Sequence, residues 1–249
     1  MSRRVFVGDV HGQYDSLMRL WDLISLDSGD AIYFVGDLID RGPQSAQVVD
    51  FVRANAAGCV RGNHEDLLLD AFAGGNINPL SMQEWLRSGG EMTLASYKDE
   101  IEALKRDIEW MQTLPLYIDL GNIWLVHAGV NPTSLLSAQS SNEFCWIRDV
   151  FHNSRSPFFE DKHIIVGHTM TFTFPNVLPG QIIEGMGWIN IDTGAYDSRG
   201  GWLTALDWDN QMVYQVNTFK SKERVRTYVD LAVKLEPSSL KPIRSRRPL

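Results

Sequence analysis

Short runs of apolar residues, rich in β-branched and aromatic side chains, recur along the chain and predict buried strands. The first two runs occupy residues 5–7 and 31–35. Apolar residues at helical spacing follow each of them, over 17–24 and 48–52. This alternation of strand and helix predicts a layered α/β arrangement for the first part of the chain.

The pattern changes further along. Helical spacing continues over 67–69 and 101–111, which predicts helices packed against a core. After Pro115 short apolar runs return, separated by Gly, Asn and Pro turn signals, and predict a second sheet with strands at 116–118, 123–126, 164–166, 182–184, 188–192, 202–207 and 212–216. The expected fold class is α/β, with one catalytic domain over 1–235 and a basic, flexible tail over 236–249.

Glycine-bounded turns carrying acids, imidazoles and an amide are the chemically distinctive part of the sequence. They read Gly8-Asp9-Val10-His11-Gly12, Gly36-Asp37-Leu38-Ile39-Asp40-Arg41-Gly42 and Arg61-Gly62-Asn63-His64-Glu65. The first two follow predicted strands directly. In open α/β sheets the strand ends form the edge at which ligands bind, because loops converge there on a rigid support. The turns therefore predict one polar site.

The residue types in these turns fit a pair of cations. Asp9 and His11 are two positions apart in an extended segment, so both can face one ion, and the Asp37 carboxylate can bridge two ions with its two oxygens. Ligands for the second ion follow or end other apolar runs: Asn63, His127 and His168. Oxygen and imidazole ligands together favour two Mn²⁺ ions, with Fe or Zn²⁺ as alternatives. A hydroxide between the ions would attack a phosphate ester.

Other polar residues fit the remaining steps of phosphate ester hydrolysis. His64 follows Asn63 and faces the other way in an extended backbone, so it is the candidate general acid. Asp40 is the candidate carboxylate that orients it and favours its protonated form. Arg41 and Arg148 are the candidates to hold the phosphoryl oxygens, because a planar guanidinium matches two of them at once.

Composition narrows the partners and the compartment. A formal net charge of −8 argues against a protein that coats nucleic acid or an anionic membrane. Cys59 and Cys145 are the only cysteines, which suits a reducing compartment. Because no apolar run approaches the roughly 20 residues of a membrane helix, we expect a cytoplasmic protein with no membrane partner. The sequence leaves the oligomeric state open.

The motifs resemble those of the phosphoprotein phosphatases, a family of calcineurin-like metallophosphoesterases. The three turns are followed in the family's order by His127-Ala128-Gly129 and Val166-Gly167-His168-Thr169. The segment Ile191-Asp192-Thr193-Gly194-Ala195 and the short chain are similar to the phage and bacterial serine/threonine phosphatases. The resemblance implies a central β-sandwich of two mixed sheets flanked by helices, with two metals at its edge.

Carried over by position, the resemblance gives the same roles as the spacing. It assigns Asp9, His11 and Asp37 to one metal, Asp37, Asn63, His127 and His168 to the other, and His64 with Asp40 to the acid pair. It assigns the phosphate to Arg41 and Arg148, with Arg155 as a substitute for Arg148 and a less defined role for Arg61.

The resemblance implies hydrolysis of phosphoserine or phosphothreonine in proteins, with phosphotyrosine as a further substrate. The main alternative is a symmetrical dinucleoside tetraphosphate (Ap4A) hydrolase; other nucleotide or RNA phosphoesterases of this fold are a smaller one. Asp40 and the third turn favour the phosphatase, because the tetraphosphate hydrolases typically have a small residue at the Asp40 position and Leu-Gly-Asn-His-Asp in that turn. A non-catalytic phosphate-binding scaffold is disfavoured, because every expected position is filled.

Overall fold

Strand β1 (Arg4–Val7) lies in the middle of the first sheet of the computed structural model, which describes residues 2–73, 77–98 and 100–237. The strand order is β11-β10-β9-β1-β2-β3. Its other strands are β2 (Ala31–Phe34), β3 (Gly58–Cys59), β9 (Trp202–Asp207), β10 (Met212–Asn217) and β11 (Lys222–Thr227). β1, β2 and β3 are parallel, whereas β9 pairs antiparallel with β1, so the sheet is mixed.

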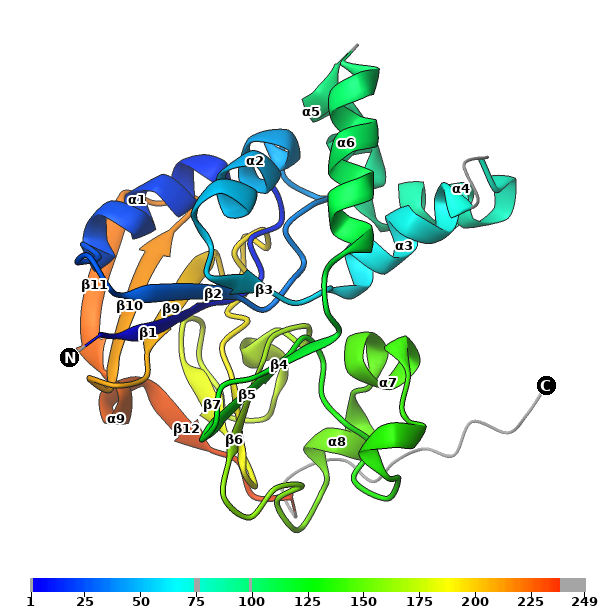
Figure 1. Cartoon of the computed structure of the whole chain (residues 1–249). Helices are drawn as coiled ribbons and strands as arrows, with labels where there is room; N and C mark the ends of the chain where they lie inside the picture. The colour runs from blue at the N-terminus through cyan, green and yellow to red at the C-terminus, as the bar shows by residue number, and fades with distance from the viewer. Residues whose placement is uncertain (1, 74–76, 99, 238–249) are drawn as a thin grey trace.

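The second sheet is also mixed and has the order β12-β7-β8-β6-β5-β4. Its strands are β4 (Tyr117–Asp119), β5 (Ile123–Val126), β6 (His163–Val166), β7 (Ile182–Glu184), β8 (Trp188–Asn190) and β12 (Ala232–Lys234). β5, β6 and β8 run parallel to one another. Figure 1 shows the two sheets stacked, with α1 (Tyr14–Ile24) and α2 (Ser45–Asn55) over the first and α7 (Ser141–Trp146) and α8 (Asp149–His152) beside the second.

Helices occupy the connections. The first group is α1 (Tyr14–Ile24), α2 (Ser45–Asn55), α3 (Asn63–Ala71), α4 (Pro79–Trp85), the kinked turn η2 (Leu86–Gly90), α5 (Glu91–Tyr97) and α6 (Ile101–Gln112). The second is η3 (Leu136–Ala138), α7 (Ser141–Trp146), α8 (Asp149–His152), η4 (Thr171–Thr173) and α9 (Tyr228–Leu231). Helices α3 to α6 rise beyond the edge of the first sheet, next to β3 (Figure 1).

Alternation along the strands builds three apolar layers. In β1, Phe6 joins the core between the sheets, while Val5 and Val7 pack with α1 and α2 on the outer face. In β5, Leu125 faces the inner core and Val126 packs with α7 and α8. Because successive side chains of a strand point to opposite faces, strands buried on both sides read as continuous apolar runs. The expected sandwich of two mixed sheets flanked by helices is confirmed.

The structure also shows elements that the apolar pattern did not predict. These are β3, β11, β12, α4, η2, α5, η3, α7, α8, η4 and α9. β11 has the sequence Lys-Glu-Arg-Val-Arg-Thr and lies at the sheet edge, where charged residues are common and the apolar signal is weak. Among the described residues, no helix is long and apolar enough to cross a membrane. Nearly all of the predicted tail, 238–249, lies outside the described residues.

Candidate active site

The two sheets bring the polar turns together at one edge of the sandwich. β1 and β2 are parallel with Val7 opposite Phe34, so the turns that follow them, with Asp9 and Asp37, emerge at the same edge. β5 and β6 are parallel in the second sheet and lead to His127 and His168. Asn63 begins α3, directly after the strand β3 and a short turn. All six predicted metal ligands are buried.

Asn63, His127 and His168 form one group of ligand atoms, which we call the asparagine cluster. The amide Oδ1 of Asn63 lies 2.9 Å from His127 Nε2 and 2.7 Å from His168 Nδ1. His127 donates its Nδ1 proton to the carbonyl of Val35 at 2.8 Å, which leaves a lone pair on Nε2. An amide oxygen and an imidazole lone pair that face each other at this distance repel unless a cation lies between them.

Burial makes the imidazoles of this cluster better metal ligands. Burial lowers the pKa of His127, and burial lowers the pKa of His168 well below the usual range, with a further lowering by the positive charge of Arg148. Both rings are therefore neutral at pH 7 and hold free lone pairs, as metal binding requires. Nε2 of His168 is buried without a hydrogen-bond partner. Together with the Asp37 carboxylate, these donors fit a divalent cation.

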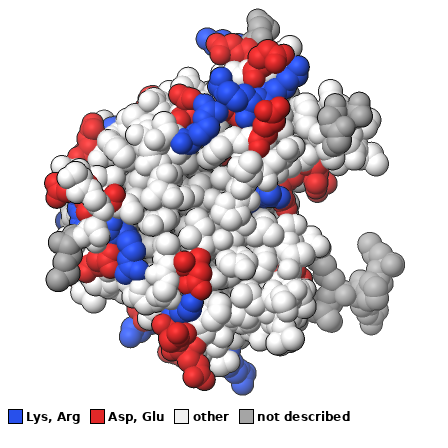
Figure 2. Space-filling model, viewed as in Figure 1, with Lys and Arg blue, Asp and Glu red and all other residues white. Residues whose placement is uncertain are grey.

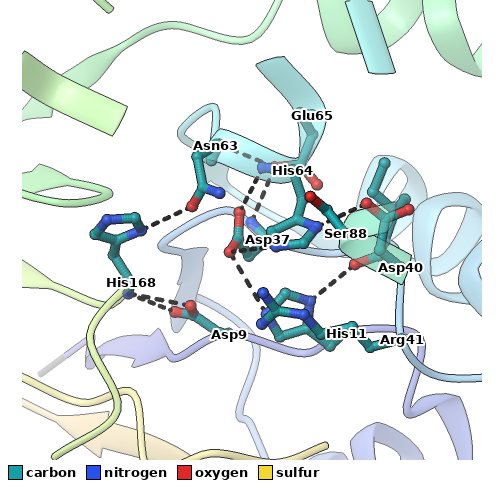
Figure 3. A network of polar contacts seen from close by, with 12 residues as sticks. Asp9, His11, Asp37, Asp40, Arg41, Asn63, His64, Glu65, Ser88 and His168 are labelled. Carbon is teal, nitrogen blue, oxygen red and sulfur yellow. Dashed lines mark hydrogen bonds and ion pairs between the residues drawn. The ribbon is translucent and has the colours of Figure 1, made fainter. Parts of the chain in front are cut away.

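Asp37 lies between the two groups of ligands, as a bridging residue must. Its Oδ1 lies 3.4 Å from His127 Nε2, and its Oδ2 lies 3.5 Å from His11 Nε2. The backbone N–H of His64 donates to Oδ1 at 3.0 Å, which fixes the carboxylate (Figure 3). His11, Asp37 and His64 form a second set of side chains whose ligand atoms lie within 4.8 Å of one another.

His11 and Arg41 form the other group, which we call the arginine-capped cluster; Asp9 lies outside the two sets of side chains whose ligand atoms lie within 4.8 Å of one another. His11 donates from Nδ1 to the carbonyl of Ile39 at 2.9 Å, so its Nε2 lone pair is available. That lone pair accepts from Arg41 Nη1 at 2.9 Å. Asp9 instead accepts from the backbone N–H of His168, at 3.0 and 3.2 Å (Figure 3).

Buried negative charge gathers around Asp9. Burial, together with the carboxylates of Asp192 and Asp37, raises the pKa of Asp9 well above its usual range. Asp192 is itself buried, which is the main reason that its pKa rises to about 6. Ionised carboxylates this close together are unfavourable in a dry site, and a cation would offset their repulsion. The charge balance therefore also fits a bound divalent ion.

The two residues of the candidate acid pair are in direct contact. His64 Nδ1 lies 2.6 Å from Asp40 Oδ2, and the two side chains are almost completely buried. The edge of the His64 ring meets the ring of His11, with centroids 4.7 Å apart. His64 Nε2 lies 4.0 Å from Asp37, so this nitrogen faces the ligand groups while Nδ1 faces Asp40.

The arginines separate into two groups. Arg148 donates to the carbonyl of His168 at 3.2 Å and to the Thr169 hydroxyl at 2.7 Å, so it lies beside the asparagine cluster. Arg61 instead donates to two carbonyls at the end of α6, those of Gln112 and Leu114. Arg155 is exposed and does not share these contacts. The structure thus brings Arg41 and Arg148 to the ligand groups.

Several site residues were not singled out from the sequence. Glu65 accepts from the backbone N–H groups of Asp37, Leu38 and Gly62 at 2.8–2.9 Å, and so joins the second and third turns. Its place in the third motif was a usable signal. Asp192 lies in the segment noted for its resemblance to phage enzymes. Trp85 and Thr93, which hydrogen-bond to Asp40, carry no signal in the sequence pattern.

Comparisons with known proteins define the class of this site. Residues 2–200 match the family model of the calcineurin-like phosphoesterases. Because this match spans most of the chain, the chain belongs to that family, a class of metal-dependent phosphoesterases.

The chain is also similar in sequence to three curated proteins. The chain is 33% identical over 232 residues to an asymmetrical bis(5'-nucleosyl)-tetraphosphatase, PrpE, of Anoxybacillus flavithermus, covering 80% of this chain and 88% of that protein. It is 39% identical over 132 residues to the symmetrical bis(5'-nucleosyl)-tetraphosphatase of Aeromonas hydrophila, covering 51% and 44%. It is 31% identical over 174 residues to serine/threonine-protein phosphatase 1 of Salmonella typhimurium, covering 66% and 76%. The matched part thus spans less than half of the symmetrical enzyme.

Proposed function

We propose that this protein hydrolyses the polyphosphate chain of dinucleoside tetraphosphates with the help of two divalent cations. The observation that carries this proposal is the similarity to the asymmetrical tetraphosphatase over most of both chains. The similarity to a symmetrical tetraphosphatase over half of this chain supports the same substrate class. The sequence alone favoured phosphoproteins as substrates. Because of these two similarities, we instead propose the substrate class of the alternative, the dinucleoside tetraphosphates.

The ligand groups would divide the cations between them. Asp9, His11 and Asp37 would hold one, and Asp37 with the asparagine cluster would hold the other, with Mn²⁺ as the favoured ion. When bound, such a pair supplies an activated water and neutralises charge on the phosphoryl group. The mixed carboxylate, amide and imidazole donors support this assignment.

The chain's own residues supply binding and proton transfer. Arg41 and Arg148 flank the ligand groups and would hold the phosphoryl oxygens through their guanidinium N–H groups. His64 would donate a proton to the departing oxygen from Nε2, while Asp40 holds its Nδ1 proton at 2.6 Å. This division of roles places the acid on the opposite side of Asp37 from the asparagine cluster.

Hydrolysis of phosphoserine or phosphothreonine in proteins, with phosphotyrosine as a further substrate, is the second candidate. The direct bond between His64 and Asp40 favours it, because the small residue typical of tetraphosphate hydrolases at position 40 offers no such carboxylate. The similarity to the Salmonella serine/threonine phosphatase supports it as well.

A direct comparison of substrates tests the proposal. Diadenosine tetraphosphate and a panel of phosphopeptides are assayed with the same Mn²⁺-loaded protein, and the nucleotide products are separated by chromatography. We expect the dinucleotide to have the higher kcat/KM; two ADP would indicate symmetrical cleavage, whereas ATP and AMP would indicate asymmetrical cleavage. A higher kcat/KM for phosphopeptides would reject the proposal in favour of the second candidate.

The acid assignment is tested separately with His64→Asn. We expect a fall in kcat of roughly 10²- to 10⁴-fold on the dinucleotide, because general acid catalysis contributes in that range. His163→Asn is a matched control, since His163 is exposed in β6 and contacts the ring of Trp208 away from the ligand groups. Retention of the full rate in His64→Asn would contradict the role of His64.

A further inference from the structure

The segment α4–η2–α5, residues 79–97, lies over the turn that carries Asp40 and Arg41. Trp85 at the end of α4 and Thr93 in α5 are completely buried, although both carry polar atoms. Buried polar atoms need partners, so the question is where their hydrogen bonds go. Both end on Asp40.

The Asp40 carboxylate is held by side chains from this segment as well as by the acid. Trp85 Nε1 donates to both carboxylate oxygens at 3.0 Å, and the Thr93 hydroxyl donates to Oδ1 at 2.6 Å. The Thr93 hydroxyl also accepts from the backbone N–H of Asp40 at 2.9 Å. His64 occupies Oδ2. The orientation of Asp40, and with it that of the His64 ring, is therefore fixed by two side chains that touch neither ligand group.

The same segment fixes the backbone of the turn. Asp40 and Arg41 have φ values of +71° and +69°, a left-handed conformation that residues other than glycine rarely adopt. The backbone N–H of Arg41 donates to the carbonyl of Gly89 at 3.2 Å. A Cβ atom on Gly89 would lie 2.9 Å from Cγ of Arg41, so only glycine allows this close approach.

The segment is tied to helices on both sides. The hydroxyl of Ser96 accepts from the backbone N–H of Ala46 in α2 at 3.1 Å, and the Tyr97 hydroxyl donates to Asp107 in α6 at 2.9 Å. Asp107 in turn pairs with Arg53 of α2. Both contacts lie at the C-terminal end of the segment, which is thereby held against two helices, and such support can set a side-chain position more precisely than a free loop can.

From these contacts we propose that α4–η2–α5 is a clamp in which Trp85 and Thr93 are positioning residues for the reaction. They hold Asp40 so that His64 presents Nε2 to the departing oxygen, and Gly89 holds Arg41 in the adjacent position. The inference rests on the proposed role of His64 as the acid. It does not depend on whether the substrate is a dinucleotide or a phosphopeptide.

Leaving-group dependence tests the clamp. In the Mn²⁺-loaded protein, Trp85→Phe removes the N–H donor and Thr93→Val removes the hydroxyl, while each keeps most of the buried volume. We expect kcat to fall at least about tenfold on phenyl phosphate, whose leaving group needs a proton, and less than about threefold on p-nitrophenyl phosphate, whose leaving group does not. KM stays unchanged, and Thr93→Ser restores the rate because it keeps the hydroxyl.

Trp21→Phe is the matched control, since Trp21 packs on Phe51 outside the site, and it should alter neither rate. An equal loss on both substrates, or no loss on either, would overturn the proposal. Failure of Thr93→Ser to restore the rate would overturn it as well. If Trp85→Phe does not fold, as judged by circular dichroism, the Thr93→Val and Thr93→Ser pair decides.

A second measurement needs no substrate. In the Zn²⁺-loaded protein, the low-field proton NMR signal of His64 Nδ1–H is assigned by its loss in His64→Asn. We expect this signal to shift in Thr93→Val and to stay in place in Trp21→Phe. An unchanged signal in Thr93→Val would overturn the clamp. Inactivity of the wild type on every phosphate ester, by contrast, would reject the proposed function while this signal still tests the clamp.

Discussion

The asparagine cluster and the arginine-capped cluster contain similar side chains but differ in how ready they are for a cation. In the first, Nε2 of His127 and Oδ1 of Asn63 lie 2.9 Å apart, and because the carbonyl of Val35 takes the Nδ1 proton of the neutral ring, two lone pairs face each other. In the second, the lone pair of His11 already accepts from Arg41. A cation in the asparagine cluster relieves a repulsion, whereas one in the arginine-capped cluster must replace a hydrogen bond. We therefore expect the two clusters to differ in their affinity for a cation, because their ligands contact different neighbours.

The largest expected effect comes from Asp37, the residue common to both clusters. Asp37→Asn removes the charge that faces both His11 and His127, so we expect kcat to fall on the order of 10³-fold or more, since the cations contribute several kcal/mol. Thermal unfolding with and without Mn²⁺ should show that the stabilisation by metal is lost. Asp50→Asn on the exposed face of α2 is the control. A variant that keeps its Mn²⁺ stabilisation would contradict the bridging position.

The next effect is a difference in affinity between the clusters. Calorimetric titration of the chelator-treated protein with Mn²⁺ should show that two ions bind. We expect the first to have a dissociation constant about 10- to 100-fold lower than that of the second. The estimate follows because replacing a hydrogen bond to a charged group costs about 1.5–3 kcal/mol. His168→Ala should remove the tight equivalent, and His11→Ala should leave it.

If His11→Ala removed the tight equivalent and His168→Ala left it, the arginine-capped cluster would be the tighter site, and the comparison would be wrong. Two equivalents of equal affinity in the wild type would show that the contact between Arg41 and His11 costs nothing. Neither outcome would depend on the identity of the substrate.

The third effect depends on pH and on Asp192, which adds negative charge to the arginine-capped cluster. Its pKa is raised from 3.8 to about 6, so the folded state favours the protonated form. The stability contributed by this group is therefore present below pH 3.8 and is lost as pH rises through about 6, a loss of about 3 kcal/mol.

Asp192→Asn should remove this loss. In denaturant titrations of the metal-free protein, the variant should gain stability relative to the wild type as pH rises from 4.5 to 7.5, by up to that amount. Added Mn²⁺ should reduce the gain, since its charge offsets the carboxylates. If the difference in unfolding free energy between Asp192→Asn and the wild type were constant across this pH range, the predicted rise in the pKa of Asp192 would be wrong.

The smallest effect concerns Glu65, which joins the turns that supply both clusters. Glu65→Gln turns an NH₂ group toward a backbone N–H donor, so we expect a loss of about 1–2 kcal/mol in the free energy of unfolding. Glu109→Gln on the exposed side of α6 is the matched control. Equal stability of the two variants would mean that the turns hold together without this carboxylate.

The apolar pattern predicted the central strands well, and the reason is local. Runs such as 123–126 are buried on both faces, so every position is apolar and the signal is strong. The two-residue β3 and the charged edge strand β11 lack this signal because tertiary pairing defines them. The sandwich was therefore predictable through its interior, and its edges were not.

The predicted site shows the same division. Asp9 and Asp37 directly follow strong strands, so their convergence could be expected from sequence. Trp85 could not be assigned a contact, because a tryptophan before Gly89 and Gly90 fits a packed helix end just as well as a hydrogen bond to Asp40. Which arginines reach the ligand groups likewise depended on how the loops pack, which separated Arg61 from Arg148.

The placement of the asparagine cluster has a consequence for assembly of the protein. Asn63 follows a strand of the first sheet, whereas His127 and His168 follow strands of the second. Neither half of the sandwich, meaning one sheet with its helices, therefore contains this cluster by itself. A cation bound there would join the two halves much as a cross-link does. Unfolding in its presence should then proceed as a single step in which the halves separate and release the ion together.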